Sequence, residues 1–287
     1  MGEPAMRQVM VAGLAVCAAV AAMPEAAAQQ VISRGGSFLE AKLLAGGRME
    51  DGRQSAALVL KVKPGWKTYW RQPGEAGVPP QFDWTGSDNL ADIEVGWPAP
   101  VVFESFGYRT LGYGGRVVLP LSLTPERAGE PVALHLSGTL GVCKEICVFE
   151  EVEEAISVPA VASSIHDGVI ASGWASLPAT AETSGVGLAA CRIAGAGDTR
   201  ALSATLTMPA GEPGAAARPM PFVVIEGPTG SWIEPPSLEE TAEGAIALEA
   251  VMRLGSADAW VERDDLRFTV LAEGLAAEIN GCSPTTG

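Results

Sequence analysis

The fold is indicated first by PVALHLSGTL (131–140) and EVEEAISV (151–158). Apolar and polar residues alternate in both stretches, which is typical of strands with one buried face because successive side chains point to opposite sides of a sheet. Similar runs occur at SAALVLKV (55–62) and GGRVVLPLSL (114–123), and turn residues such as Gly, Pro, Asp and Asn separate them. This pattern predicts an all-β protein built as a β-sandwich.

The chain beyond residue 160 predicts a second sandwich after a short connection. SSIHDGVIASGW (163–174) begins with Ser and places apolar residues from Ile165 to Trp174 at roughly helical spacing, so we expect a short helix there. LPATAETSG (177–185) has the composition of a linker. Strand-like runs then resume as VGLAACRIAG, ALSATLTMPA, PFVVIEG, AIALEAVMRLG, LRFTVLAEG and AAEINGC. The expected divisions are a signal peptide at 1–28, a first β-sandwich domain at 29–162, a helix and linker at 163–185, and a second β-sandwich domain at 186–287.

The composition is that of an acidic globular protein. Hydrophobic residues make up 47% and charged residues 18% of the 287 residues, which excludes a disordered tail. The 34 acidic and 19 basic side chains give a formal charge of −15, which disfavours nonspecific binding to nucleic acid or anionic lipid. We interpret the acidity as a solubilising surface, because no short acidic cluster has the spacing of a metal-binding loop.

The N-terminus resembles an export signal. MGEPAMRQ carries one Arg, VMVAGLAVCAAVAAM is an apolar run of about 15 residues, and small residues end at Ala28, after which we expect cleavage. A membrane anchor is the weaker alternative, because the run is shorter than the ~20 residues that cross a bilayer and Pro24 interrupts it. The stretch from Leu14 to Cys17 also resembles a lipoprotein cleavage box, so lipidation is a second alternative.

The cysteines suggest two different roles. Signal removal discards Cys17 and leaves Cys143, Cys147, Cys191 and Cys282 in a compartment where disulfides persist, with three pairings open. By chain entropy, a bond between Cys143 and Cys147 contributes about 2 kcal/mol, against about 4.6 kcal/mol for one between Cys191 and Cys282. The short pair therefore suits a redox switch, and the long pair suits a structural disulfide. A bond between Cys143 and Cys147 also requires the chain to turn between them.

Two other interpretations of the short pair stay open. The first is an inert turn disulfide. The second is a copper or zinc site, although two thiolates are too few ligands and the nearest histidine, His135, is eight residues away on the expected solvent face of a strand. We predict no metal and no cofactor. No Ser, His or Asp lies in a nucleophile motif, so the sequence gives hydrolase chemistry no support.

A family resemblance is carried by GWKTYWRQPGEAGVPPQFDW (65–84), VGWPAP (95–100), FGY (106–108) and LGVCKEIC (140–147). These residues resemble the N-terminal periplasmic domain of the DsbD and ScsB thiol:disulfide interchange proteins, over roughly residues 36–160. The C-terminal half resembles, more weakly, the extra β-domain of the ScsB-like branch. The C-x3-C spacing is the one expected for that branch and differs from the C-x5-C of the DsbD domain. The resemblance implies a periplasmic immunoglobulin-like domain that takes electrons from a membrane domain and passes them to disulfide proteins.

The same resemblance implies the site residues. Carried over by position, Cys143 and Cys147 match the redox pair and are the expected catalytic residues. The aromatic cap that shields the pair in this family is expected within VFESFGY, where Phe103, Phe106 and Tyr108 are the candidates. The transmembrane conduit and the thioredoxin domain of the family are missing here, so we expect a separate DsbD-, CcdA- or ScsB-like membrane protein as the electron donor.

Two further expectations concern residues near the pair. We assign the aromatic block to the core and the sandwich edge; its members are Trp66, Tyr69, Trp70, Phe82 and Trp84. We expect Arg71 and Glu75 to form a local ion pair. The sequence does not decide which cysteine attacks a partner, because Lys144 would lower the pKa of a neighbouring thiol and Glu145 would oppose it.

The resemblance thus implies a periplasmic protein-disulfide reductase. It would relay reducing equivalents from the membrane donor to periplasmic thioredoxin-fold or other disulfide proteins, in cytochrome c biogenesis, disulfide isomerisation or tolerance of copper and oxidative stress. The main alternative is a non-catalytic immunoglobulin-like binding module or copper-handling accessory protein. A third is a purely structural secreted sandwich.

Overall fold

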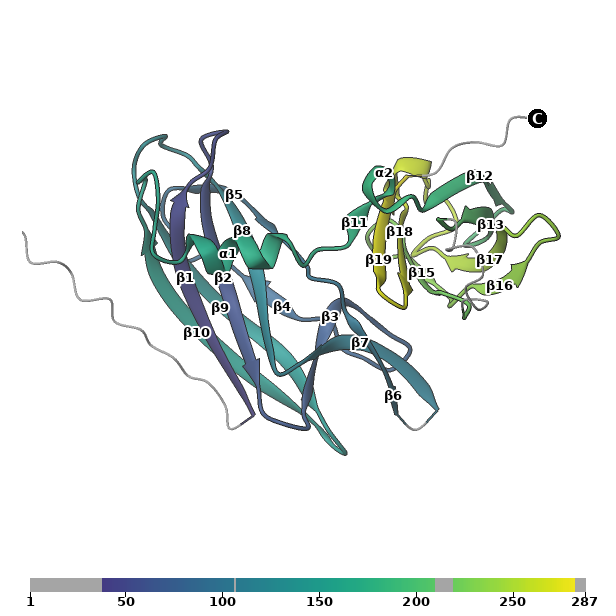
Figure 1. Cartoon of the computed structure of the whole chain (residues 1–287), viewed down its shortest axis with the longest axis horizontal. Coiled ribbons are helices and arrows are strands. Elements are labelled where there is room, and N and C mark those ends of the chain that lie inside the picture. The colour runs from purple at the N-terminus through teal and green to yellow at the C-terminus, as the bar shows by residue number, and fades with distance from the viewer. Residues whose placement is uncertain (1–37, 106, 210–218, 282–287) are drawn as a thin grey trace, which may run out of the picture.

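Two β-sandwiches joined by a short helix make up the computed structural model, which describes residues 38–105, 107–209 and 219–281 (Figure 1). Strands β1–β10 form the first sandwich and strands β11–β19 form the second. The predicted all-β, immunoglobulin-like architecture is therefore confirmed. The signal peptide expected at 1–28 lies outside the described residues. Within the described ranges, no helix is both long and apolar enough to cross a membrane.

The first sandwich consists of two antiparallel sheets. One sheet has the order β1 (Leu39–Arg48), β2 (Gln54–Val62), β8 (Arg116–Pro125) and β5 (Leu90–Val95). The other has the order β10 (Cys147–Val158), β9 (Val132–Cys143), β3 (Lys67–Gly74), β7 (Tyr108–Gly114) and β6 (Val101–Ser105), and β4 (Gln81–Asp83) also pairs with β9. The expected strands at 55–62, 114–123, 131–140 and 151–158 correspond to β2, β8, β9 and β10.

The alternation of apolar and polar residues that predicted β9 reflects which face of the strand is buried in this sandwich. Leu134 and Leu136 are buried in the core, whereas His135 between them is half-buried and its Nε2 lies 3.9 Å from Glu153 Oε1. From Leu140 to Cys143 the strand is buried on both faces. At that end β9 pairs with β3 as well as β10, so neither of its edges faces solvent.

The second sandwich also has two sheets. One has the order β11 (Ala179–Thr180), β19 (Leu275–Asn280), β18 (Arg267–Ala272) and β14 (Phe222–Glu226). The other has the order β12 (Gly187–Ala194), β13 (Thr199–Thr207), β17 (Ile246–Arg253) and β15 (Trp232–Ile233), with β16 (Ser237–Glu240) also pairing with β17. A 3-10 turn, Arg263–Asp265, precedes β18.

The helix between the two sandwiches is shorter than the one that the sequence pattern predicts. Helix α1 spans Asp167–Trp174, and Asp167 accepts hydrogen bonds from the backbone N–H groups of Gly47 and Ser164. Ile165 precedes the helix and is almost fully exposed, so it does not belong to the apolar face expected for it. Within the expected linker, residues 179–184 form β11 and the short helix α2 (Ala181–Ser184), and β11 pairs with β19 of the second sandwich.

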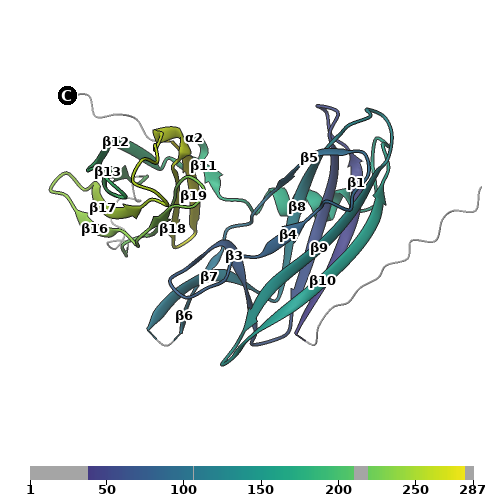
Figure 2. The same cartoon turned by 180° about the vertical axis from the view of Figure 1, so that it is seen from behind.

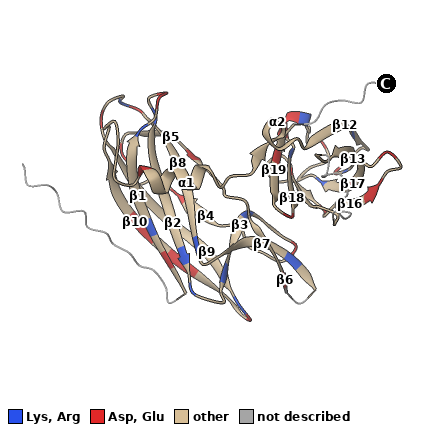
Figure 3. Ribbon diagram, viewed as in Figure 1, with Lys and Arg blue, Asp and Glu red and all other residues tan. Residues whose placement is uncertain are grey.

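Each sandwich has its own hydrophobic core. Trp70 is fully buried among side chains from both sheets of the first sandwich, and Phe268 has the same place in the second. Figure 3 shows acidic residues along β10 of the first sandwich and on β16 of the second. Each core is formed by apolar side chains, but not every charge lies outside it, because Glu150 and Glu154 of β10 are buried.

Candidate functional site

A disulfide between Cys143 and Cys147 closes the end of the β9–β10 hairpin. The two cysteines are opposite each other in the antiparallel register, as the last residue of β9 and the first of β10. The three residues between them form the turn, in which the N–H of Lys144 donates to the carbonyl of Ile146 over 3.0 Å. The chain does turn between the cysteines, as the length of a disulfide requires.

The two sulfur-bearing residues differ in their access to solvent. Cys143 is only 2% exposed, whereas Cys147 is an exposed residue. Ile146 and Phe149, on either side of Cys147, are 66% and 67% exposed. A macromolecular thiol or disulfide can therefore approach Cys147, with apolar side chains around it, while Cys143 is shielded by the sandwich.

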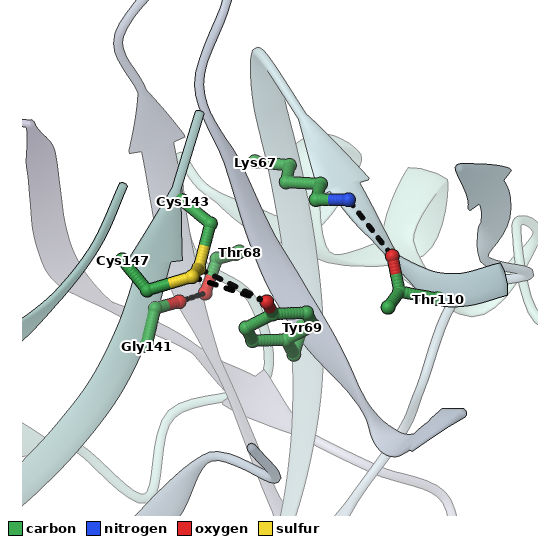
Figure 4. Close-up of a disulfide and its surroundings, with 7 residues drawn as sticks. All are labelled: Lys67, Thr68, Tyr69, Thr110, Gly141, Cys143 and Cys147. Carbon is green, nitrogen blue, oxygen red and sulfur yellow. Dashed lines mark hydrogen bonds between the residues drawn. A yellow bond between two sulfur atoms is a disulfide. The ribbon is translucent and has the colours of Figure 1, made fainter. Parts of the chain in front are cut away.

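Tyr69 of β3 contacts both sulfurs, as Figure 4 shows. Its Oη lies 2.9 Å from Cys143 Sγ and 3.7 Å from Cys147 Sγ. Because a disulfide sulfur carries no hydrogen, the hydroxyl is the donor. Burial raises the pKa of Tyr69, so the hydroxyl keeps its proton at neutral pH. The tyrosine thus aims a hydrogen-bond donor at the buried end of the disulfide.

Tyr69 reaches the sulfurs because β3 is held against β9 immediately before it. Thr68 is fully buried, and its Oγ1 donates to the carbonyl of Gly141 over 2.9 Å. Tyr69 belongs to the aromatic block expected in the core and at the sandwich edge. It is buried, but its contact with the cysteines depends on strand pairing between positions more than 70 residues apart, which alternation alone does not give.

Lys67 is a buried cation on the strand next to the disulfide. It is opposite Cys143 in the β3–β9 register, and its Nζ donates to Thr110 Oγ1 over 2.8 Å. The same Nζ lies 5.0 Å from the centre of the Phe103 ring. Burial lowers the pKa of Lys67. No local sequence pattern indicates this contact, because it joins Lys67 to a residue 43 positions away.

The two described candidate cap residues lie on β6 and β7, at the edge of this sheet opposite to β10 and β9. Phe103 is on β6, Tyr108 begins β7, and both strands lie beyond β3 in the order β10-β9-β3-β7-β6. Phe103 is half-buried and packs on Lys67, and Tyr108 is exposed. Phe106 lies outside the described residues. The shielding role of these three residues stays a prediction, whereas Tyr69 makes the hydrogen bonds to the sulfurs described above.

The structure describes one of the two cysteines of the predicted structural disulfide. Cys191 is fully buried in the core of the second sandwich and is disulfide-bonded. Cys282 lies outside the described residues, so its pairing with Cys191 stays a prediction.

The expected local ion pair between Arg71 and Glu75 is wrong. Arg71 instead binds Glu226 and Glu278 of the second sandwich. The carboxylate of Glu75 accepts a hydrogen bond from the backbone N–H of Arg109 over 2.7 Å. The register of β3 against β7 shifts between Tyr69 and Gly74, and sequence proximity does not reveal such an irregularity.

In the part of the chain that the structure describes, no group of three or more His, Cys, Asp and Glu side chains could hold a metal ion.

The fold and the site define a class: an immunoglobulin-like sandwich with a disulfide at the accessible end of a hairpin. Residues 40–159 match the family model described as thiol:disulfide interchange protein DsbD, N-terminal. The predicted family resemblance is therefore confirmed over the first sandwich, and it supports a role in thiol-disulfide exchange. No curated protein sequence matches the chain significantly.

The two-sandwich architecture also has a counterpart among solved structures. The crystal structure of the N-terminal periplasmic domain of ScsB from Proteus mirabilis matches with a TM-score of 0.61 and 22% sequence identity. The match covers 87% of this chain and 94% of that one. At this identity the similarity establishes the shared fold, which includes both sandwiches.

Proposed function

We propose that the protein is a periplasmic thiol-disulfide interchange protein that relays reducing equivalents through Cys143 and Cys147. The observation that carries this proposal is the exposed Cys147 at the hairpin end, bonded to the buried Cys143. A disulfide that served only to hold the turn would need neither an exposed cysteine nor the exposed Ile146 and Phe149 around it. The family match over residues 40–159 supports the same class of reaction.

In the proposed reaction Cys147 is the attacking residue and Cys143 the resolving one. The Cys147 thiolate of the reduced protein attacks one sulfur of a partner's disulfide, and the partner's S–S bond breaks as a mixed disulfide forms. The partner's first thiolate leaves and takes up a proton. Cys143, after losing its proton, attacks Cys147 Sγ, which releases the partner's second thiolate and forms the Cys143–Cys147 disulfide. Two electrons pass to the partner in each cycle.

Recharging reverses these steps with a dithiol donor. The donor thiolate attacks the exposed Cys147 sulfur, Cys143 leaves as a thiolate, and the donor's second thiol resolves the mixed disulfide. In both directions Tyr69 donates a hydrogen bond to the Cys143 sulfur as it becomes the buried thiolate. Hydrogen bonds to a charged acceptor are stronger than those to a neutral one, so Tyr69 favours the reduced protein.

The finer assignments belong to the same proposal. The signal peptide at 1–28 would export the chain to the periplasm, where a membrane-embedded protein of the DsbD, CcdA or ScsB type would be the donor and thioredoxin-fold or other disulfide proteins the acceptors. Phe103, Phe106 and Tyr108 would shield the pair in the absence of a partner. Cys191 and Cys282 would form the structural disulfide of the second domain, within the divisions 29–162, 163–185 and 186–287.

A redox titration of the mature protein tests the proposal. A Cys143–Cys147 couple near or above about −200 mV fits exchange with periplasmic proteins. A couple resistant to reduction below about −300 mV would leave only a structural role for the bond. Stoichiometric copper binding that is lost in Cys143→Ser would instead favour the copper-handling accessory.

Trapping with single-cysteine variants tests the assignment of the attacking residue. Cys143→Ser leaves the exposed Cys147 without its resolving partner, so it should accumulate a mixed disulfide with a protein disulfide substrate. The matched variant Cys147→Ser leaves only the buried cysteine and should accumulate little. The reverse result on a non-reducing gel would show that Cys143 attacks.

A further inference from the structure

Arg71 links the second sandwich to the strand beside the disulfide. Its Nε lies 2.9 Å from Glu226 Oε1, and its Nη2 lies 2.8 Å from Glu226 Oε2 and 2.5 Å from Glu278 Oε2. The Arg71 side chain is only 14% exposed, and its guanidinium carbon lies 4.2 Å from the centre of the Trp70 ring. Bidentate hydrogen bonding between a planar guanidinium and a carboxylate fixes the orientation as well as the position of the two side chains.

The two carboxylates belong to a rigid part of the second sandwich. Glu226 ends β14 and Glu278 is on β19, and these strands flank β18 on either side. Arg267 of β18 lies 3.6 Å from Glu278 Oε1 and is opposite Glu226 in the register. Because both carboxylates are on paired strands of one sheet, they form a fixed anchor for Arg71.

Arg71 lies in a part of β3 whose sheet pairing is irregular. Strand β3 pairs with β9 at Lys67 and Thr68, and further along β9 the pairing passes to β4. The register with β7 shifts between Tyr69 and Gly74. Arg71 is in this shifted segment, two residues after Tyr69. In this segment the fully buried Trp70 and the contacts of Arg71 with the second sandwich hold β3 where the regular ladder is interrupted.

Other contacts between the sandwiches involve the neighbouring strand and the core. The guanidinium carbon of Arg109 on β7 lies 4.9 Å from the centre of the Phe222 ring on β14. Val224, also on β14, is buried within the hydrophobic cluster of the first sandwich. Figure 1 and Figure 2 show, from opposite sides, the second sandwich beside β3 and β7. The anchor thus acts on the strands that carry Tyr69, Lys67 and its partner Thr110.

We propose that Arg71 is a positioning residue through which the second sandwich sets the redox equilibrium of the Cys143–Cys147 pair. The carboxylates of Glu226 and Glu278 hold Arg71, Arg71 holds β3, and β3 holds the Tyr69 hydroxyl against the sulfurs. The inference rests on the proposed function, since such tuning matters in a protein that exchanges its disulfide. It assigns the second sandwich a role in the chemistry of the first.

The direction of the effect follows from the hydrogen bond of Tyr69. A hydroxyl held at 2.9 Å from Cys143 Sγ stabilises the reduced thiolate more than the neutral disulfide. Release of β3 weakens this bond and shifts the equilibrium with glutathione toward the disulfide. A hydrogen bond of ordinary net strength corresponds to a shift of about two- to tenfold.

The test measures the equilibrium of the mature protein with glutathione in four variants. Glu226→Gln/Glu278→Gln removes both anchoring charges without changing the first sandwich, and Tyr69→Phe removes the hydroxyl. The third variant combines all three substitutions. Glu234→Gln is the matched control, because it removes an ion pair with Arg253 inside the second sandwich, where Arg253 Nη2 lies 2.8 Å from Glu234 Oε1. Circular dichroism checks that each variant is folded at the assay temperature.

The expected result is a shift toward the disulfide of about two- to tenfold in the double variant and in Tyr69→Phe, with no further shift in the combined variant. Glu234→Gln should match the wild type. An unchanged equilibrium in the double variant would overturn the inference, and so would a shift that adds fully to that of Tyr69→Phe. Failure of the proposed function has a different signature: the wild-type protein would not transfer electrons to a protein disulfide, whatever its glutathione equilibrium.

Discussion

The two sandwiches share an architecture but differ in how far their cysteines are exposed to solvent. The first carries Cys147 at the exposed end of a hairpin, and the second buries Cys191 completely in its core. The hairpin strands β9 and β10 have twelve residues each, whereas the longest strand in the described part of the second sandwich, β13, has nine. At about 3.4 Å per residue, a twelve-residue strand is roughly 40 Å long. In Figure 1 the tip of the β9–β10 hairpin lies at the lower edge of the first sandwich, apart from the second sandwich.

This difference separates fold from function within one chain. An immunoglobulin-like sandwich supplies a stable core in both halves, with Trp70 in one and Phe268 in the other. Chemistry is added in the first half by one hairpin end and one tyrosine from the adjacent strand. The general rule that function lies in sites carried on a fold applies here to two copies of a similar fold.

The largest expected effect comes from removing the exposed sulfur. Cys147→Ala should reduce electron transfer to a protein disulfide to background, because no thiolate is left within reach of a partner. Cys191→Ala should leave transfer within about tenfold of the wild type, since it alters the structure of the second sandwich and not the reacting atoms. Both rates are measured as reduction of a fluorescent disulfide-linked peptide. Equal losses in the two variants would contradict the division of roles between the sandwiches.

A core substitution in the second sandwich should destabilise that sandwich strongly, although it changes no residue in contact with the Cys143–Cys147 bond. Phe268 is fully buried, so Phe268→Ala should lower the free energy of unfolding by about 3–5 kcal/mol. Denaturant unfolding followed by far-UV circular dichroism measures the change. If Arg71 transmits the state of the second sandwich, the glutathione equilibrium of this variant should shift in the same direction as that of Glu226→Gln/Glu278→Gln. A destabilised variant with a wild-type equilibrium would show that the first sandwich is autonomous.

Most of the first sandwich could be predicted from the sequence, because alternation in runs such as residues 131–140 reports directly which face of a strand is buried. The need for a turn at Cys143–Cys147 followed from bond geometry alone. The contacts that define the site could not be predicted in the same way. Tyr69 reaches Cys143 only through the β3–β9 register, and Arg71 reaches Glu226 across 155 residues of sequence. Local patterns carry no information on pairing between distant strands.

The two kinds of disulfide should also differ in their effect on stability. Replacing Cys143 and Cys147 together by Ala should cost about 2 kcal/mol of unfolding free energy, because the bond closes a very short loop. The predicted long loop between Cys191 and Cys282 corresponds to about 4.6 kcal/mol by the same relation. Denaturant unfolding of the two double variants checks the order. A greater loss from the short pair would mean that the hairpin disulfide supports the fold and is not free to open during exchange.

The smallest expected effect concerns Tyr113, a buried tyrosine of the first sandwich whose hydroxyl has no sulfur to contact. Its Oη donates to the carbonyl of Pro98 over 2.8 Å, so Tyr113→Phe should lower the free energy of unfolding by about 1 kcal/mol at neutral pH. Burial raises the pKa of Tyr113 well above its usual value. The contribution of Tyr113 to stability is therefore fully present below the pKa of an unfolded tyrosine, about 10, and declines as the pH rises above it, because the unfolded chain then releases a proton that the folded chain keeps.

Unfolding measured between pH 8 and pH 11 should show a shallower alkaline decline in Tyr113→Phe than in the wild type, with the glutathione equilibrium unchanged at neutral pH. A shift in that equilibrium as large as the one caused by Tyr69→Phe would mean that any buried tyrosine hydroxyl in this sandwich affects the disulfide, and that contact with the sulfurs does not distinguish Tyr69.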